Sequence, residues 1–186
     1  KVTAFYAGEP SLQTIYLPFE DYGEYAYLPW ENDLPDQFMT MHGYDLIPRM
    51  DALFGGFSTR SKMVRLHFFQ TVGEVMARNY SGQISRWCHE NGVNMSGHPL
   101  FEEFMTCHVL CYGDMMKVIR NFDIPGCDLP IARPGKINWN FWMPKFISSA
   151  SYLENRNKMV TGLIDPIIGY GEDDMSPDVP YMKRTL

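Results

Sequence analysis

The sequence predicts an α/β fold of (β/α)8 TIM-barrel type, with about four βα units in its 186 residues. Two observations predict it. Short β-prone runs alternate with helical segments along the chain, which is the order of parallel βα units. The first run is apolar, as suits a strand buried on both faces of a parallel sheet. A complete barrel needs about 250 residues and eight strands. The chain therefore supplies either about half of a barrel or a smaller open sheet.

The first strand is expected at residues 2–7, directly before Gly8-Glu9-Pro10. Because a proline disfavours the helical region for the residue before it, we expect Glu9 to be extended and its carboxylate to leave the tip of the strand. Residues 11–60 form a long loop insertion rich in Pro, Gly and Tyr, within which residues 34–41 are expected to form a short helix. An insertion of this length is typical of a functional loop.

The strongest helical pattern covers residues 58–91, where Phe68, Val72 and Val75 belong to one apolar stripe. A bend is expected at Ser81-Gly82. Beyond it, three further strands are expected at 93–98, 124–128 and 159–165, with helices at 101–122 (broken near residues 112–114) and 139–156. The tail from about residue 169 is acidic and rich in proline. We therefore expect one partial (β/α)-barrel domain over residues 1–186.

Composition excludes several function classes. The net charge is −6 without a run of Lys or Arg, so a nucleic-acid footprint is absent. No stretch approaches the roughly 18 consecutive apolar residues of a membrane span. The motifs HExxH and GxSxG are also missing. Aromatic residues make up 15% of the chain, and they either fill the core or line a carbohydrate cleft, with Trp30 a candidate substrate-binding ring. The four cysteines are expected to be buried free thiols.

Polar side chains follow each predicted strand at the point where it ends. Glu9, His98, Asp128 and Asp165 each come after a β-prone run. The active sites of barrels and open parallel sheets lie outside the carboxyl ends of their strands. The sequence therefore predicts that these side chains share one rim, although a cap or turn role remains the alternative for each.

Glycosidic bond cleavage needs a proton donor to the leaving oxygen and either a nucleophile or a base that activates water. Glu9 fits the donor role. Its partner is open among Asp165, Glu102, Glu103 and Asp128, because spacing along the chain does not decide which carboxylate approaches through space.

His98 and the two glutamates after it have two interpretations. Glu102 and Glu103 fall in the first turn of a predicted helix, where acidic residues favour the helix dipole. Alternatively, His98 with one of them binds sugar hydroxyls or a divalent cation.

Several strings, in this order along the chain, resemble the barrel domain of glycoside hydrolase family 106, the α-L-rhamnosidase-like enzymes. They are Phe5-Tyr-Ala-Gly-Glu9-Pro10, Pro29-Trp30 with Asp33-Leu34-Pro35, Gly43-Tyr44-Asp45-Leu46, Trp87-Cys88, Ser96-Gly97-His98 with Glu102-Glu103, Tyr112-Gly113-Asp114 and Asp123-Ile124-Pro125-Gly126-Cys127-Asp128. The likeness covers most of residues 1–165.

The resemblance implies a (β/α)8 barrel that hydrolyses a terminal deoxy-sugar with inversion, with no required cofactor but with calcium in some members. It implies that Glu9 is the general acid after the fourth barrel strand, so that this chain holds the second half of the barrel. Relatives carry a Thr-Asp-Glu-Pro-like string where this chain has Ala7-Gly8-Glu9-Pro10. They also carry a Ser-Glu-Thr-like string where it has Val160-Thr161-Gly162-Leu163. Either Asp165 substitutes for the missing glutamate, another carboxylate serves, or this segment is catalytically weakened.

The leading hypothesis is a rhamnosidase-like glycosidase with Glu9 and Asp165 as catalytic residues and with Trp30, His98, Glu102, Glu103 and Asp128 binding substrate. The alternatives are a degenerate carbohydrate-binding barrel and a metal-dependent hydrolase. The expected partner is a carbohydrate substrate, with no nucleic acid and no membrane span. Because half a barrel leaves sheet edges open, self-association or a longer chain is expected. The resemblance implies a secreted or periplasmic protein.

Overall fold

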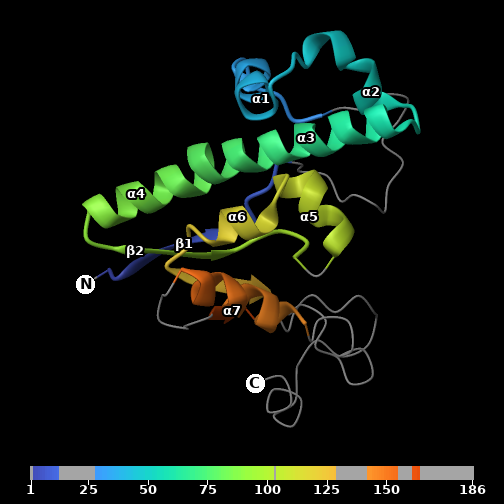
Figure 1. The fold of residues 1–186 in the computed structure, drawn as a ribbon. Helices are drawn as coiled ribbons and strands as arrows, with labels where there is room; N and C mark the ends of the chain where they lie inside the picture. Colours follow the sequence, from blue (N-terminus) through green and yellow to red (C-terminus); the bar gives the residue numbers. More distant parts are fainter. Residues whose placement is uncertain (1, 13–27, 103, 129–141, 155–160, 164–186) are drawn as a thin grey trace, which may run out of the picture.

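A computed structural model of the chain describes residues 2–12, 28–102, 104–128, 142–154 and 161–163 (Figure 1). Its four strands are β1 (Ala4–Gly8), β2 (Asn94–His98), β3 (Ile124–Asp128) and β4 (Thr161–Leu163). They form one sheet in the order β1-β2-β3-β4, and every neighbouring pair is parallel. The predicted parallel α/β architecture is therefore confirmed. Within the described ranges the sheet is open, with β1 and β4 at its edges.

A glycine in β2 allows the first two strands to pair. The register runs from Ala4 opposite Asn94 to Gly8 opposite His98. A Cβ atom on Gly97 would lie 2.2 Å from the carbonyl oxygen of Ala7, a distance that no side chain tolerates. Glycine at this position therefore brings the tips of β1 and β2 together, so that Gly8 and His98 end the two strands side by side.

The long helical pattern folds as one continuous rod above the sheet (Figure 1). It consists of α3 (Thr59–Met76), a π-helical turn (Ala77–Ser81) and α4 (Gly82–Glu90). The π turn lies where the sequence predicted a bend. Asn121 holds it from outside the rod, because its side-chain amide donates hydrogen bonds of 2.9 Å to the carbonyl oxygen of Ala77 and to the hydroxyl of Ser81. Single π turns within α-helices are common at functional sites.

The other helices are α1 (Leu34–His42), α2 (Asp51–Phe54), α5 (Met105–Tyr112), α6 (Met115–Ile119) and α7 (Met143–Leu153), with a 3-10 turn at Ile47–Arg49. The break predicted near residues 112–114 separates α5 from α6. Gly113 makes this break at a φ of 68° and touches α3, since a Cβ atom there would lie 2.3 Å from the backbone nitrogen of Gly73. The sequence therefore placed most helices to within a few residues, but α5 begins at Met105 and not at residue 101, so Glu102 precedes the helix and does not lie in its first turn.

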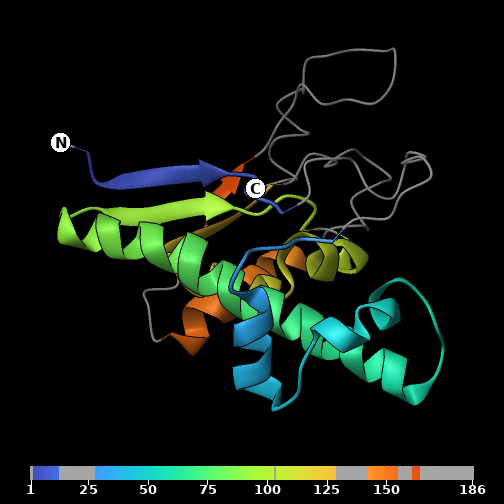
Figure 2. The ribbon, with the colours of Figure 1, turned by 90° about the horizontal axis from the view of Figure 1, so that it is seen from above.

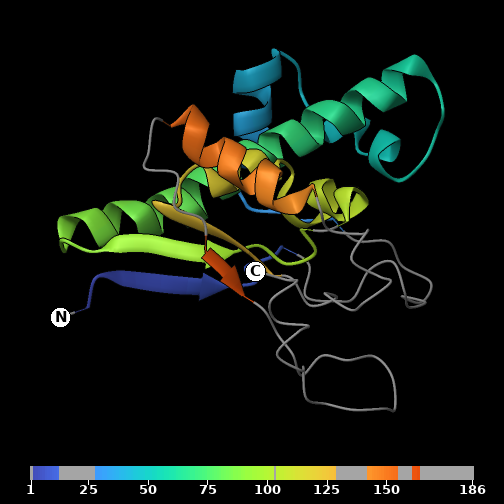
Figure 3. The same ribbon diagram turned by 90° about the horizontal axis from the view of Figure 1, so that it is seen from below.

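Two hydrophobic cores lie on either side of the α3 rod. Figures 2 and 3 show the helices gathered on one side of the sheet, with α4 running along β2. The larger core joins the sheet to α5, α6 and α7 and includes Met95, Tyr112, Ile119, Phe122, Cys127, Met143 and Ile147. The smaller core joins α1 and α2 to α3 and includes Leu34, Phe38, Leu46, Leu53, Val64, Phe68 and Val72. Part of the predicted loop insertion is thus a packed helical unit.

The cysteine prediction is confirmed, since Cys88, Cys107, Cys111 and Cys127 are all buried and free. No helix in the described ranges is long and apolar enough to cross a membrane. The predictions for Glu103, for Asp165 and for the acidic tail fall outside the described residues.

Candidate active site

The tips of β1 and β2 bring Glu9 and His98 together. The backbone N–H of Glu9 donates a hydrogen bond of 3.0 Å to the carbonyl oxygen of His98. His98 is buried, with 2% of its surface exposed, whereas Glu9 is exposed. The imidazole Nε2 lies on the β1 side, 3.9 Å from where a Cβ atom on Gly8 would stand. A buried imidazole and an exposed carboxylate therefore share the rim predicted from the sequence.

The prediction that Glu9 is extended is wrong. Glu9 has a φ of 52°, in the left-handed region that residues other than glycine rarely occupy. Pro10 disfavours the right-handed helical region but leaves this one open, and the hydrogen bond to His98 fixes the backbone there. A short sequence pattern does not distinguish the two conformations, because the partner of that hydrogen bond is on another strand.

Glu102 holds the other side of the His98 ring. Its Oε1 lies 3.5 Å from His98 Nδ1, and only 2% of Glu102 is exposed. The backbone of Glu102 is fixed in turn, because His108 Nε2 donates a hydrogen bond of 2.7 Å to its carbonyl oxygen. Burial lowers the pKa of His108, which favours a neutral ring. This buried chain of contacts orients His98 with its Nε2 toward the tip of β1.

Tyr112 is a part of the site that the sequence reasoning missed. Its buried hydroxyl accepts a hydrogen bond of 2.5 Å from the backbone N–H of Leu100 and donates one of 3.1 Å to the carbonyl oxygen of the same residue. Burial raises the pKa of Tyr112 far above its usual range, and the charges of Glu102 and Glu9 act in the same direction. The phenol therefore stays neutral and fixes the turn after β2. The sequence analysis placed this tyrosine at a helix break and in one of the strings that resemble the family, but gave it no role in the site.

Backbone strain concentrates at the same place. Among the described residues, only Glu9 and Phe101 combine a side chain with a positive φ, at 52° and 55°. Glu9 follows β1, and Phe101 directly precedes Glu102. Strained residues persist where the surrounding structure holds them, and such positions cluster at active sites. Two strained positions that flank one rim are thus an independent sign of function.

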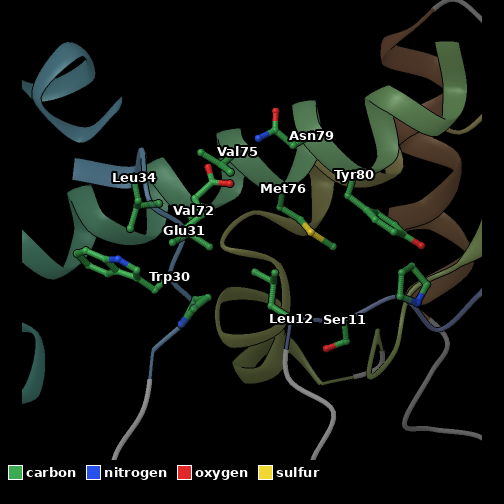
Figure 4. Close-up of a pocket in the computed structure, with 12 residues that line it drawn as sticks. Ser11, Leu12, Trp30, Glu31, Leu34, Val72, Val75, Met76, Asn79 and Tyr80 are labelled. Carbon is green, nitrogen blue, oxygen red and sulfur yellow. The ribbon is translucent and has the colours of Figure 1, made fainter. Parts of the chain in front are cut away.

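A cavity of about 420 Å³ begins at Pro10, directly after Glu9 (Figure 4). One wall is the α3 rod with its π turn, and it consists of Val72, Val75, Met76, Asn79 and Tyr80. The facing wall consists of the segment after β1 and the segment before α1, with Ser11, Leu12, Pro29, Trp30, Glu31 and Leu34. Trp30 is 45% exposed at this cavity, so the predicted aromatic residue lines a hollow surface rather than the core.

The cavity has few polar groups, and the sequence reasoning did not find them. Asn79 and Tyr80 reach it from the π turn, and burial raises the pKa of the Tyr80 hydroxyl. Burial also raises the pKa of Glu31, and the nearby carboxylate of Asp33 adds to the effect. The apolar pattern of the helix did not indicate that Asn79 and Tyr80 line a cavity, because the direction of their side chains depends on the π turn.

The structure thus brings Glu9, His98 and Glu102 together and places Trp30 at the adjoining cavity. The backbone of Asp128 ends β3, opposite Leu163 of β4, as predicted. Within the described residues, no three His, Cys, Asp or Glu side chains gather as metal ligands do.

A model of the glycoside hydrolase 106 family, described as alpha-L-rhamnosidase, matches residues 7–141. A protein of Formosa agariphila with the name "Putative beta-glucuronidase" is 27% identical over 132 residues, which are 67% of this chain and 10% of that protein. The solved rhamnosidase of Novosphingobium sp. PP1Y superimposes with a TM-score of 0.56 at 20% identity, over 77% of this chain and 14% of that structure.

The chain spans about a tenth of the length of the curated relative. The likeness to the solved rhamnosidase supports the fold found here. The match to the family model covers the candidate acid, the cavity and the turn after β2, and it extends over more than half of the sequence. The chain therefore belongs to glycoside hydrolase family 106, the alpha-L-rhamnosidase family.

Proposed function

We propose that this chain carries the general acid of an α-L-rhamnosidase-type site, which cleaves a terminal sugar from a glycoside. Water attacks the sugar, and the configuration at the anomeric carbon is inverted. Glu9 donates its proton to the leaving oxygen. The observation that carries the proposal is the place of Glu9, which is exposed at the tip of β1 and fixed by its hydrogen bond to His98. A general acid has to reach the oxygen that it protonates, and an exposed carboxylate beside a cavity meets that condition.

His98 and Glu102 have different roles in this proposal. Glu102 lies against Nδ1 of His98, so it is proposed to position the ring. Nε2 of His98, which lies on the β1 side, is proposed to hydrogen-bond a hydroxyl of the sugar. Trp30 provides a flat apolar surface near the acid.

The second carboxylate and the rest of the barrel complete the proposal. Asp165 is the proposed base, and Asp128 and Glu103 are proposed to bind substrate at the ends of the strands. The parallel sheet is proposed to be about half of a (β/α)8 barrel. The much greater length of the relatives supports this view, since a longer chain supplies the remaining strands.

The proposed mechanism uses no metal ion. Calcium takes several oxygen ligands, commonly carboxylates. The described residues hold no cluster of three such side chains, and the carboxylates at positions 103 and 165 fall outside those residues, so calcium, which the resemblance implies for some members, is not part of the proposal. Membership of the family favours hydrolysis over the two alternatives of a degenerate barrel and a metal-dependent hydrolase.

The test compares Glu9→Gln with Glu90→Gln in the full chain, using methyl α-L-rhamnoside as substrate, because its poor leaving group depends on an acid. Glu90 is an exposed residue at the end of α4 and serves as the matched control. Loss of the acid is expected to lower kcat by about a hundredfold or more, whereas Glu90→Gln keeps the activity of the parent. Equal activity of the two variants would show that Glu9 is not the acid.

A further inference from the structure

The cavity next to Glu9 does not include the residues at the tip of β2. It begins at Pro10, the residue after Glu9, and continues along the α3 rod. Neither His98 nor Glu102 lines it. The imidazole proposed to bind the cleaved sugar is therefore separate from the cavity, and Glu9 adjoins both, through its backbone hydrogen bond to His98 and through its peptide bond to Pro10.

The lining of this cavity is mostly apolar. Leu12, Pro29, Trp30, Leu34, Val72 and Val75 contribute hydrocarbon surface. Its polar groups are the side chains of Ser11, Glu31 and Asn79 and the hydroxyl of Tyr80. A volume of about 420 Å³ is within the range of small-molecule sites. A second sugar ring would bury several hydroxyls against valine and leucine, and each unsatisfied one costs about 1–3 kcal/mol.

Hydrogen bonds to the rest of the protein fix both walls of the cavity. The backbone N–H of Leu12 donates a hydrogen bond of 3.0 Å to the carbonyl oxygen of Cys111 in α5, which ties the segment after Glu9 to the core. On the other wall, the Asn121 amide holds the π turn that presents Asn79 and Tyr80. Figure 4 shows the two walls facing each other across the cavity. A preformed site binds a ligand with little loss of conformational entropy.

We propose that this cavity binds the leaving group of the glycoside, and that the leaving group is an alcohol with an apolar ring rather than a second sugar. The inference rests on the proposed function, because a general acid stands between the cleaved sugar and the group that departs with its proton. The sugar occupies the side of His98, and the departing ring enters beyond Pro10 and packs on Trp30.

The test uses two substrates of the full chain that share one sugar, 4-nitrophenyl α-L-rhamnoside and methyl α-L-rhamnoside. For each substrate, kcat/KM of a variant is divided by that of the parent, so the different intrinsic reactivity of the two leaving groups cancels. For the aryl substrate, Trp30→Ala is expected to lower kcat/KM about tenfold relative to the parent. For the methyl substrate, kcat/KM of the variant is expected to stay within about twofold of the parent. Trp30→Phe keeps a ring and is expected to restore most of the loss.

The matched control is Trp87→Ala. Trp87 is 49% exposed, close to the 45% of Trp30, but it packs against Phe5 at 5.5 Å between ring centroids and does not line the cavity. Trp87→Ala is expected to change kcat/KM by the same factor for both substrates. An equal loss of both substrates in Trp30→Ala, or no loss of either, would overturn the assignment of the cavity to the leaving group.

A second readout separates this inference from the proposed function. Binding of free 4-nitrophenol, measured by calorimetry, needs no turnover. The inference predicts binding that weakens in Trp30→Ala and persists in Trp87→Ala. If the parent hydrolyses neither glycoside yet shows this binding pattern, the proposed function and the leaving-group role are both contradicted. The binding of an aromatic ring in the cavity is then still supported. If both glycosides are hydrolysed but the two variants bind 4-nitrophenol equally, the inference fails alone.

Discussion

The backbone N–H of Glu9 donates a hydrogen bond of 3.0 Å to the carbonyl oxygen of His98. This bond lies at the tips of the first two strands, and it joins the proposed acid to the proposed sugar-binding imidazole. The position of the proposed acid relative to the proposed sugar-binding imidazole therefore depends on the register of β1 on β2. A change in that register would separate them.

Gly97→Ala tests this dependence. The added Cβ would stand 2.2 Å from the carbonyl oxygen of Ala7, and both atoms belong to paired backbone that has no room to move. We expect a loss of about 3 kcal/mol in the free energy of unfolding, or more, measured by urea denaturation. Gly55→Ala is the control, because Gly55 has extended backbone and nothing within 4 Å of the added atom. Equal stability of the two variants would contradict the close approach of the strands.

Glu102 is expected to act through His98. Glu102→Ala leaves a buried imidazole without its carboxylate and is expected to lower the free energy of unfolding by about 3 kcal/mol. In Glu102→Gln a polar oxygen of the same size still faces Nδ1, so this variant is expected to fold and to lose about tenfold in kcat/KM. Chemical unfolding curves measure the stability of Glu102→Ala, and steady-state kinetics measure kcat/KM of Glu102→Gln. A Glu102→Ala variant as stable and active as the parent would exclude the positioning role.

The sequence predicted the parallel strands, the long helix and the break at Gly113, because these features depend on local periodicity and on glycine. It also placed Glu9 and His98 at one rim, since parallel strands bring their carboxyl ends together. It did not predict the left-handed backbone of Glu9, the contact of Tyr112 with Leu100 or the π turn. Each of these depends on a partner distant along the chain, such as Asn121 for the π turn. Within residues 11–60 the sequence pattern predicted helical segments, but it did not predict that they pack on α3.

Asn121→Ala is expected to destabilise the π turn. The variant loses two hydrogen bonds of 2.9 Å, to the carbonyl oxygen of Ala77 and to the hydroxyl of Ser81. We expect a decrease of about 1–3 kcal/mol in the free energy of unfolding. In Asn91→Ala, by contrast, an exposed side chain loses one bond to the carbonyl oxygen of Trp87, so its effect is expected to be smaller. A larger loss for Asn91→Ala than for Asn121→Ala, measured by chemical denaturation, would contradict this view of the turn.

The packing of α1 on α3 is expected to weaken in acid. His42 stacks on His67 with ring centroids 4.1 Å apart and hydrogen-bonds Thr71 at 3.1 Å. Burial lowers the pKa of His42, and the charge of His67 adds to the effect. Below pH of about 6.5 the unfolded chain therefore takes up a proton that the folded chain binds less readily. Stability falls as the pH falls through this window and levels off below the pKa of the folded state.

The measurement for this effect is the melting temperature of the parent and of His42→Gln between pH 7.5 and pH 5. The glutamine does not titrate, so the variant is expected to lose less stability over this range than the parent. Parallel curves for the two proteins would show that His42 does not contribute to the acid sensitivity.

The most direct test of the central claim, that Glu9 protonates the leaving oxygen, is the dependence of kcat/KM on the acidity of the leaving group. A series of aryl α-L-rhamnosides is measured with the parent and with Glu9→Gln in the full chain. A good leaving group needs little help from an acid. If Glu9 is the acid, kcat/KM of Glu9→Gln depends more steeply on the leaving group, with the largest loss for the poorest leaving groups. The same slope for both proteins would contradict it.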